Sequence, residues 1–225
     1  MDNGELLASG RDADVWLLPD GWVLRRYRDT VQQVEREAAY LRWVARHGYP
    51  VPEVRRAEGV ELEMRRLTGR TLLGELVAGS LTAAEVGTRL GLLLRTLHAV
   101  PALDPHAPGA HRVRHGDLHP DNVLATPSGD VVIDWTTADD GPPGFDTAHS
   151  AVIIAQTLDQ PDVHGVSTDG VLALLTALLQ AADGFDEDDL AAAVRRRTAN
   201  PTLLPRETAA VPAAATLVRR LAGGA

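Results

Sequence analysis

Three side chains with oxygen ligand atoms occur at a characteristic sequence spacing in the middle of this 225-residue chain. Asp117 and Asn122 are separated by four residues, and Asp134 follows seventeen positions after Asp117. Carboxylate and amide oxygens are ligands that suit Mg²⁺, and a second carboxylate can accept or orient a hydroxyl proton. The set predicts phosphate-transfer chemistry, with Asp117 as the base and with Asn122 and Asp134 as metal ligands.

A loop and a strand must position these groups. The loop reads HGDLHPDNVL over residues 115–124, where Pro120 stiffens the middle and apolar residues hold the loop down. The run Val131–Trp135 follows a turn expected at Gly129–Asp130, and it predicts a short strand that ends at Asp134.

This block resembles the aminoglycoside phosphotransferase and choline-kinase-like family of small-molecule kinases, which share the protein-kinase fold. The family writes its catalytic loop as H-G-D-x-H-x-x-N and its metal-ligand strand as I-D-W or I-D-F, and both stand here, as HGDLHPDN and VIDW. The resemblance implies a two-lobe, protein-kinase-like α+β fold. Residues 1–67 would form a mostly β nucleotide-binding N-lobe, and residues 68–225 a larger helical C-lobe with the catalytic loop and the acceptor site.

The same resemblance implies an activity. The protein would be a transferase that moves the γ-phosphate of ATP, with Mg²⁺ as cofactor, to a hydroxyl of a small molecule such as an amino-sugar, an amino alcohol or a related metabolite. No residue pattern names the acceptor or the oligomeric state. The alternative is a kinase-like protein that binds nucleotide but is weak or inactive in catalysis.

The resemblance also assigns nucleotide-binding residues near the N-terminus. A turn at residues 9–13 with Gly10 as its single glycine would cover the phosphates, although an ordinary hairpin turn explains it as well. Arg25 falls where the family has its phosphate-holding lysine, with Arg26 as the alternative one residue on, and Glu37 would pair with it. The hinge that meets adenine through its backbone would involve Met64, Arg65 and Arg66.

Lysine is absent from the chain, so all 22 basic residues are arginine. Any phosphate contact that lysine makes elsewhere must here use arginine or backbone groups. In the strand expected over residues 22–27, alternation places Val23 and Arg25 on one face and Arg26 on the other. The helix that follows offers two acidic candidates, Glu35 and Glu37, and either could simply lie on a solvated face.

The remaining elements follow from hydrophobic periodicity, turn signals and caps. Strands are also expected over residues 5–8 and 14–18, with two more within residues 54–67. Thr82 with Glu85 forms a capping box. The family resemblance also implies an aspartate about a dozen residues after the metal ligand, and Asp146 fits it, as the residue that would tie the catalytic loop to the start of a helix. Helices are expected over residues 30–46, 72–78, 82–100, 147–159, 168–183, 187–199 and 206–222.

A metal-dependent hydrolase is the rival interpretation of the same block. His111, His115 and His119 recur every four residues and would make a zinc set on one helical face. However, Gly116 and Pro120 oppose a helix through this segment. Bracing of the loop by hydrogen bonds is the simpler role for His115.

Composition limits the class of protein. With 44% hydrophobic and 24% charged residues, the chain has the make-up of a globular protein. It contains no cysteine, which excludes disulfides and thiol nucleophiles. A net charge of −9 argues against nucleic acid as a partner. The N-terminus lacks a signal pattern and no apolar run is long enough for a bilayer, so a cytoplasmic protein without membrane contact is expected.

Overall fold

The computed structural model describes residues 5–9, 13–28, 31–159 and 165–223. The chain divides into two compact units. Unit 1 contains residues 1–69 and 124–138, and unit 2 contains residues 70–123 and 139–225. Each unit has its own buried core, and each carries part of the residues singled out by the sequence.

Unit 1 is built on a five-stranded antiparallel sheet in the order β1-β2-β3-β5-β4. Tight turns connect its hairpins, with Gly21 at φ 76° before β3 and Gly59 at φ 58° before β5, a left-handed conformation that glycine adopts without strain. The strands are β1 (Leu6–Ser9), β2 (Ala13–Leu18), β3 (Trp22–Tyr27), β4 (Val54–Glu58) and β5 (Glu61–Arg65).

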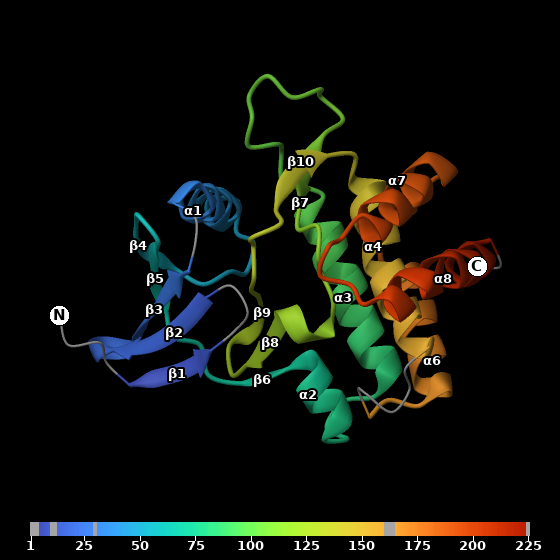
Figure 1. Cartoon of the computed structure of the whole chain (residues 1–225), viewed down its shortest axis with the longest axis horizontal. Helices are drawn as coiled ribbons and strands as arrows, with labels where there is room; N and C mark the ends of the chain where they lie inside the picture. The colour runs from blue at the N-terminus through green and yellow to red at the C-terminus, as the bar shows by residue number, and fades with distance from the viewer. Residues whose placement is uncertain (1–4, 10–12, 29–30, 160–164, 224–225) are drawn as a thin grey trace. The chain divides into compact units, whose positions relative to one another are not determined.

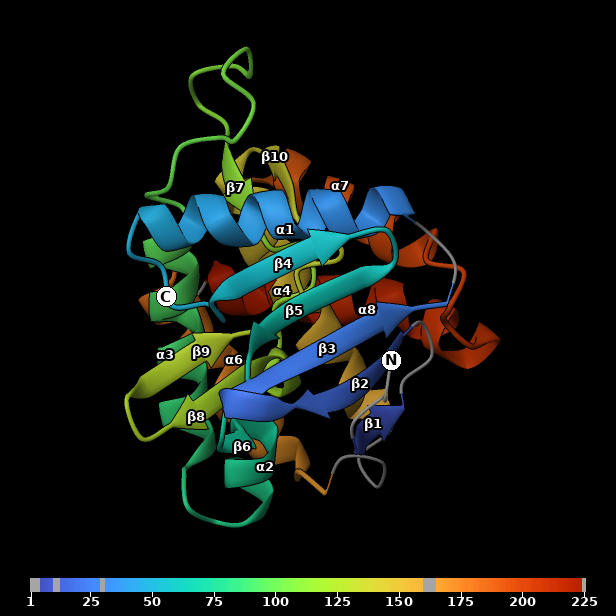
Figure 2. The same cartoon turned by 90° about the vertical axis from the view of Figure 1, so that its left-hand side faces the viewer.

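Helix α1 (Val31–Arg46) lies against the β4 and β5 side of this sheet (Figure 2). Its apolar residues recur at helical spacing, and Val34, Ala38, Leu41 and Val44 are almost fully buried. The helix therefore covers the sheet with one apolar stripe.

The second segment of unit 1 supplies β9 (Gly129–Val132) and all but the first residue of β8 (Val123–Thr126), and the two strands pair as a hairpin. The sequence placed the turn at Gly129–Asp130, but it lies at Pro127–Ser128. The strand also ends at Val132 rather than at Asp134. Asp134 has φ 62°, a left-handed conformation that cannot continue a strand, which is why the pairing stops before it.

Unit 2 is mostly helical, with α4 at its centre (Figure 1). Nearly every residue of α4 is buried, because α3, α6, α7 and α8 all pack on it. The helices are α2 (Leu72–Val77), α3 (Ala83–Leu97), α4 (Pro143–Gln156), α6 (Thr168–Ala181), α7 (Glu187–Thr198) and α8 (Pro205–Ala222), with the 3₁₀ turns η2 (Pro120–Asn122) and η3 (Thr157–Asp159).

Helices α3 and α6 approach each other closely because two glycines face the contact. A Cβ built on Gly87 would lie 2.1 Å from the Leu174 carbonyl oxygen, and one built on Gly91 would lie 2.7 Å from the Ala181 Cβ. The expected capping box of Thr82 and Glu85 begins α3.

The sequence did not predict four short strands. Two of them, β7 (Arg112–Arg114) and β10 (Asp139–Gly141), pair antiparallel in unit 2 and bracket the catalytic loop in sequence. The others are β6 (Arg70–Thr71) and β8. Strands of two to four residues carry too little alternation to be recognised in sequence.

Candidate active site

The loop between β7 and η2 carries Asp117. The buried carboxylate of Asp146 holds the first residues of this loop in place. The two carboxylate oxygens of Asp146, in the first turn of α4, accept the backbone N–H groups of His115 and Gly116, each at 2.8 Å. Gly116 has φ 75°, which lets the chain turn there. Asp146 therefore ties the loop to the start of a helix, as the sequence predicted.

Asp146 is ionised at neutral pH even though it is fully buried. Burial acts to raise its pKa, but the contact with His98, whose Nε2 lies 3.6 Å from the carboxylate, and the backbone donors from the loop hold the pKa at about 2. A fixed negative charge thus anchors the loop.

Two histidines hold Asp117 itself. Its backbone N–H donates to His115 Nδ1 at 3.3 Å, and its carboxylate lies 3.7 Å from His119 Nε2. Burial opposes ionisation, but interaction with His119 outweighs it and lowers the pKa of Asp117 below the usual aspartate value. Asp117 is therefore a carboxylate at neutral pH, able to orient a hydroxyl and to receive its proton.

Asn122 is buried at the end of η2, and the loop fixes its amide. The Nδ2 group donates to the Asp117 carbonyl oxygen at 2.9 Å and lies 3.1 Å from His119 Nε2. Within the described residues no hydrogen bond uses the amide oxygen, so that oxygen is available to a cation. A neutral oxygen ligand of this kind suits Mg²⁺.

A separate charge cluster forms in unit 1 around Arg25. Its guanidinium lies 3.2 Å from Glu37 and 3.1 Å from Asp134, so the expected pair of Arg25 with Glu37 is present. Tyr27 also donates its hydroxyl to Glu37. Burial raises the pKa of Glu37 while Arg25 opposes the rise, and the two carboxylates raise the pKa of Arg25 despite its burial. Arg25 thus links β3, α1 and the segment that follows β9.

Asp134 keeps one oxygen for a ligand. Its Oδ1 accepts from Arg25 and, at 3.1 Å, from the Thr136 hydroxyl, whereas within the described residues Oδ2 has no hydrogen-bond partner. The side chain is 39% exposed. A non-glycine residue held at φ 62° stores backbone strain, and such strain clusters at functional sites.

The structure separates the alternatives that the sequence left open beside Arg25. Arg26 lies on the opposite face of β3 and pairs with Glu61 at 2.8 Å. On α1, Glu35 is exposed while Glu37 is 2% exposed. Strand alternation and helix phase therefore put Arg25 and Glu37 in one cluster. The prediction for Gly10 and its turn lies outside the described residues, as does Thr30 at the expected start of the helix.

The three hinge candidates lie at the end of β5. Met64 is half-buried, and Arg65 and Arg66 are exposed. The Arg65 guanidinium lies 4.0 Å above the Trp22 ring. The backbone N–H of Arg65 donates to the Glu53 carbonyl oxygen and that of Arg66 donates to the Gly21 carbonyl oxygen, so both N–H groups already have partners.

The zinc-hydrolase interpretation finds no support in the described part of the chain. No group of three or more histidine and acidic side chains with metal-binding geometry occurs there. His115 is fully buried and braces the loop, and the segment from His111 to His119 runs through β7 and a loop instead of a helix. Helical spacing therefore does not apply to these histidines.

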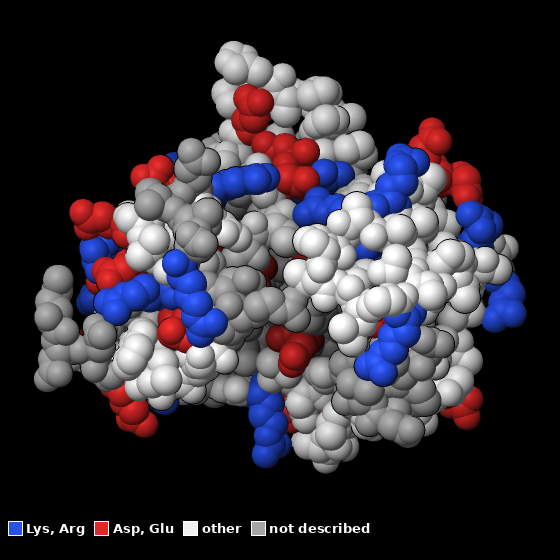
Figure 3. Space-filling model, viewed as in Figure 1, with Lys and Arg blue, Asp and Glu red and all other residues white. Residues whose placement is uncertain are grey.

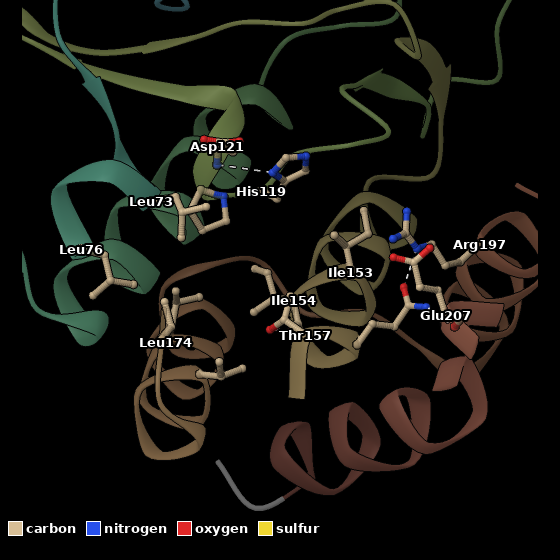
Figure 4. A pocket seen from close by; sticks show the side chains of 14 residues that line it. Leu73, Leu76, His119, Asp121, Ile153, Ile154, Thr157, Leu174, Arg197 and Glu207 are labelled. Atoms are coloured by element: carbon tan, nitrogen blue, oxygen red, sulfur yellow. Dashed lines mark hydrogen bonds between the residues drawn. The ribbon is translucent and has the colours of Figure 1, made fainter. Parts of the chain in front are cut away.

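A cavity of about 270 Å³ lies inside unit 2 beside the catalytic loop (Figure 4). Figure 4 shows leucines of α2 and α6 at one end and Arg197 with Glu207 at the other. His119 and Asp121 form part of the wall, so the loop that holds Asp117 borders the cavity. The sequence interpretation missed this pocket.

The sequence patterns singled out neither Arg197 nor Glu207 as a functional residue. Arg197 closes the run Arg195–Arg197, a cationic helix end of the kind that the helix dipole favours. Within that run only Arg195 is exposed, while Arg197 turns inward and donates from Nε to Gln156 Oε1 at 2.5 Å. Helical phase against the apolar positions of α7 was the one signal that could have distinguished them.

These two residue sets stand in a fold of the protein-kinase-like class. A family model described as the phosphotransferase enzyme family matches residues 3–105 and 101–192. The chain belongs to this family. Comparison with curated proteins finds no match.

Solved structures support the fold. An amicoumacin kinase in complex with AMP-PNP, Ca²⁺ and Ami aligns with a TM-score of 0.57 at 12% identity, over 97% of this chain and 88% of its own. An aminoglycoside-3'-phosphotransferase of type VIII gives 0.55 at 18% identity, over 96% and 91%. A choline/ethanolamine kinase family protein from Mesorhizobium loti gives 0.57 at 16%, over 96% and 87%. The expected protein-kinase-like α+β fold is confirmed.

Within the residues that the structure describes, none of the helices combines the length and the apolar character that a membrane span requires.

Proposed function

We propose that the chain transfers the γ-phosphate of ATP to a hydroxyl group of a small molecule. The observation that carries this is the fixed pair in unit 2, an ionised Asp117 whose own carbonyl oxygen orients the Asn122 amide at 2.9 Å. A base and an oxygen ligand held together in one loop are what this chemistry requires.

In the proposed reaction, Asp117 orients the acceptor hydroxyl. The hydroxyl oxygen bonds to the γ-phosphorus, the bond from that phosphorus to the β–γ bridging oxygen breaks, ADP leaves, and the hydroxyl proton passes to Asp117. Because the pKa of Asp117 is lowered, orientation contributes more than early proton removal.

Asn122 and Asp134 would hold Mg²⁺, since each offers an oxygen that takes part in no described hydrogen bond. When bound, Mg²⁺ would neutralise charge on the phosphates. Arg25 would contact the phosphates, with Glu37 positioning its guanidinium, and the backbone at Met64, Arg65 and Arg66 would meet the adenine. In this proposal residues 1–67 contact the phosphates and the adenine, and residues 68–225 supply the two metal ligands, the base and the acceptor site.

Two features of the chain support the proposed partners. The net charge is −9, and on the face drawn in Figure 3 acidic and basic side chains are interspersed, unlike the basic surface that nucleic acid needs. This surface fits a small-molecule partner, and we propose neither nucleic acid nor a membrane as a partner. Dependence on ATP supports a cytoplasmic location.

A nucleotide-binding protein without transferase activity is the second candidate. The contact of Arg25 with Asp134 at 3.1 Å favours it, because a guanidinium there competes with a metal ion for the same carboxylate. The complete loop around Asp117 favours transfer, since a protein that only binds nucleotide has little need of a base.

Two variants test the proposal. Asp134→Ala should weaken Mg-ATP binding at least tenfold in calorimetric titration with the circular dichroism spectrum unchanged. Asp117→Asn should bind Mg-ATP as the unmodified chain does, yet lose a hundredfold or more of ATP consumption in the presence of pooled small alcohols. Full turnover by Asp117→Asn, or unchanged Mg-ATP affinity in Asp134→Ala, would reject the assigned roles.

A further inference from the structure

The cavity in unit 2 has an apolar end. Leu73 and Leu76 of α2, Ile153 and Ile154 of α4, and Leu174 of α6 line it (Figure 4). None of its lining residues within the described chain is Trp, Tyr or Phe. An aromatic cage is the usual recognition device for a quaternary ammonium group, so this wall suits an aliphatic chain better than a choline-like head.

The other end of the cavity holds a cation with few protein partners. Arg197 donates from Nε to Gln156, whose Nε2 in turn donates to the Glu207 carbonyl oxygen at 2.7 Å. The side chain is half-buried, and within the described residues no carboxylate lies within ion-pair distance of it. Gln156 therefore fixes the guanidinium of Arg197. The two terminal nitrogens of this guanidinium are left to a ligand.

The burial of Arg197 is not fully compensated. Loss of water lowers the pKa of its guanidinium, although the charges of Asp117 and Glu207 act to raise it. A ligand carboxylate could form the bidentate contact for which a guanidinium fork is suited. Asp117 belongs to the same loop as His119 and Asp121, which line the cavity, and its negative charge acts on Arg197.

The two acidic residues of the wall already have partners. Glu207 Oε2 accepts the backbone N–H of Leu204 at 2.7 Å, and Asp121 Oδ1 accepts the Thr71 hydroxyl at 2.8 Å. One oxygen of each carboxylate is thus engaged within the protein. A polycationic amino-sugar would also bring its ammonium groups close to the positive charge of Arg197, and this repulsion disfavours that class of acceptor.

We infer that the acceptor is a small hydroxy acid with an aliphatic tail. Its carboxylate binds Arg197, its hydroxyl lies at Asp117, and its tail packs against the leucines of α2 and α6. The cavity volume, just under the range of about 300–1,000 Å³ found for drug-sized ligands, suits a compound of this size. The inference rests on the proposed phosphotransfer for the role of the hydroxyl, and its binding test does not depend on nucleotide.

Three eight-carbon alcohols that differ in one terminal group test this inference. They are 3-hydroxyoctanoate, 1,3-octanediol and 1-amino-3-octanol, and their affinities are measured by calorimetry on the full chain without nucleotide. The hydroxy acid should bind at least tenfold more tightly than the amine, with the diol between them. Equal affinities, preference for the amine or no binding of the hydroxy acid at millimolar concentration would overturn the inference.

Variants locate the effect. Arg197→Gln should lose tenfold or more of the affinity for 3-hydroxyoctanoate and little for the diol, and Leu76→Ser should weaken all three probes alike. Arg195→Gln is the matched control, since Arg195 is exposed on the same helix. An Arg197→Gln protein that keeps the preference for the acid would overturn the inference. If that variant does not fold, the ranking in the unmodified chain still decides.

Failure of the proposed phosphate transfer and failure of the inferred ligand class would give different results. Tight hydroxy-acid binding without ATP consumption would remove the proposed transfer and keep the ligand class. ATP consumption with an amino-sugar such as neamine, and none with 3-hydroxyoctanoate, would keep the transfer and remove the ligand class.

Discussion

At the scale of single residues, we propose that Arg25 performs the task for which the resembling family uses lysine. Its planar fork reaches two carboxylates at once, Glu37 and Asp134, which a single ammonium does with less geometric definition. The charge of Asp134 is therefore balanced within unit 1. Nucleotide phosphates and Mg²⁺ would have to share or displace this contact.

Substitution of Arg25 should therefore weaken nucleotide use. We expect Arg25→Ala to raise the ATP concentration needed for half-maximal turnover tenfold or more, because a phosphate contact and the positioning of Asp134 are both lost. Arg26→Ala should have little effect, since Arg26 pairs with Glu61 on the other face. Steady-state kinetics with both variants give the ranking.

The control for Arg25→Ala concerns folding. Removal of one partner from a buried ion pair can cost about 3–5 kcal/mol by itself. Arg25→Lys keeps a cation beside Glu37, so it should recover most of the stability and part of the ATP affinity. A reversed ranking of Arg25→Ala and Arg26→Ala would show that the phosphate contact belongs to Arg26.

The sequence was sufficient for residues whose position depends on local pattern. Alternation along β3 and the phase of α1 brought Arg25 and Glu37 together, and the loop motif placed Asp117 beside Asn122. The partners of Arg197 and of His149 could not be predicted, because they depend on how α4 and α7 pack. The left-handed backbone at Asp134 was also hidden, since no glycine marks it.

At the scale of elements, the contact between α3 and α6 depends on the absence of two side chains. A glycine inside a helix costs about 1 kcal/mol of propensity relative to alanine. Here the cost is offset by close packing, because a Cβ at Gly87 would collide with the Leu174 backbone. Leu174 also lines the cavity, so this packing positions one wall of the proposed acceptor site.

We therefore expect Gly87→Ala to destabilise the protein despite its better helix propensity. Overpacking of this kind typically costs about 1–3 kcal/mol, measured as a lower midpoint of chemical unfolding followed by far-ultraviolet circular dichroism. Thr88→Ala, at the next and exposed position of α3, should leave stability unchanged or slightly raise it. A stabilised Gly87→Ala protein would mean that α6 moves away at little cost.

Most helices of unit 2 were predicted nearly to their ends. The expected ranges 168–183, 187–199 and 206–222 compare with α6 at 168–181, α7 at 187–198 and α8 at 205–222. Caps and periodicity fix such ends locally. The helix expected over 147–159 begins earlier, at Pro143, since proline is well suited to a first helical turn.

At the scale of the whole molecule, stability should depend on pH through His149. This residue is buried in α4, stacks on Phe145, and neither ring nitrogen has a partner within the described residues. Burial lowers its pKa from 6.5 to about 4, although the charge of Asp146 opposes the shift. Between these values the unfolded chain binds the proton and the folded chain does not, so stability falls as the pH falls.

From pH 7 to pH 4, His149 should remove roughly 3 kcal/mol of the free energy of unfolding. His149→Leu should abolish this part of the pH dependence, which urea unfolding at several pH values would measure. His106→Gln serves as the control because His106 is exposed. If the slope between pH 4 and 6.5 is unchanged in His149→Leu, the ring is hydrated or already paired in solution.

The division into two units also determines which unit each spectroscopic signal of this protein follows. Every indole and phenol chromophore belongs to unit 1, namely Trp16, Trp22, Trp43, Trp135, Tyr27, Tyr40 and Tyr49. Intrinsic fluorescence and absorbance near 280 nm therefore follow unit 1 alone, whereas helical ellipticity comes mainly from unit 2. The chain carries its own pair of separate optical signals, and the difference between the two unfolding curves measures how strongly the units melt together.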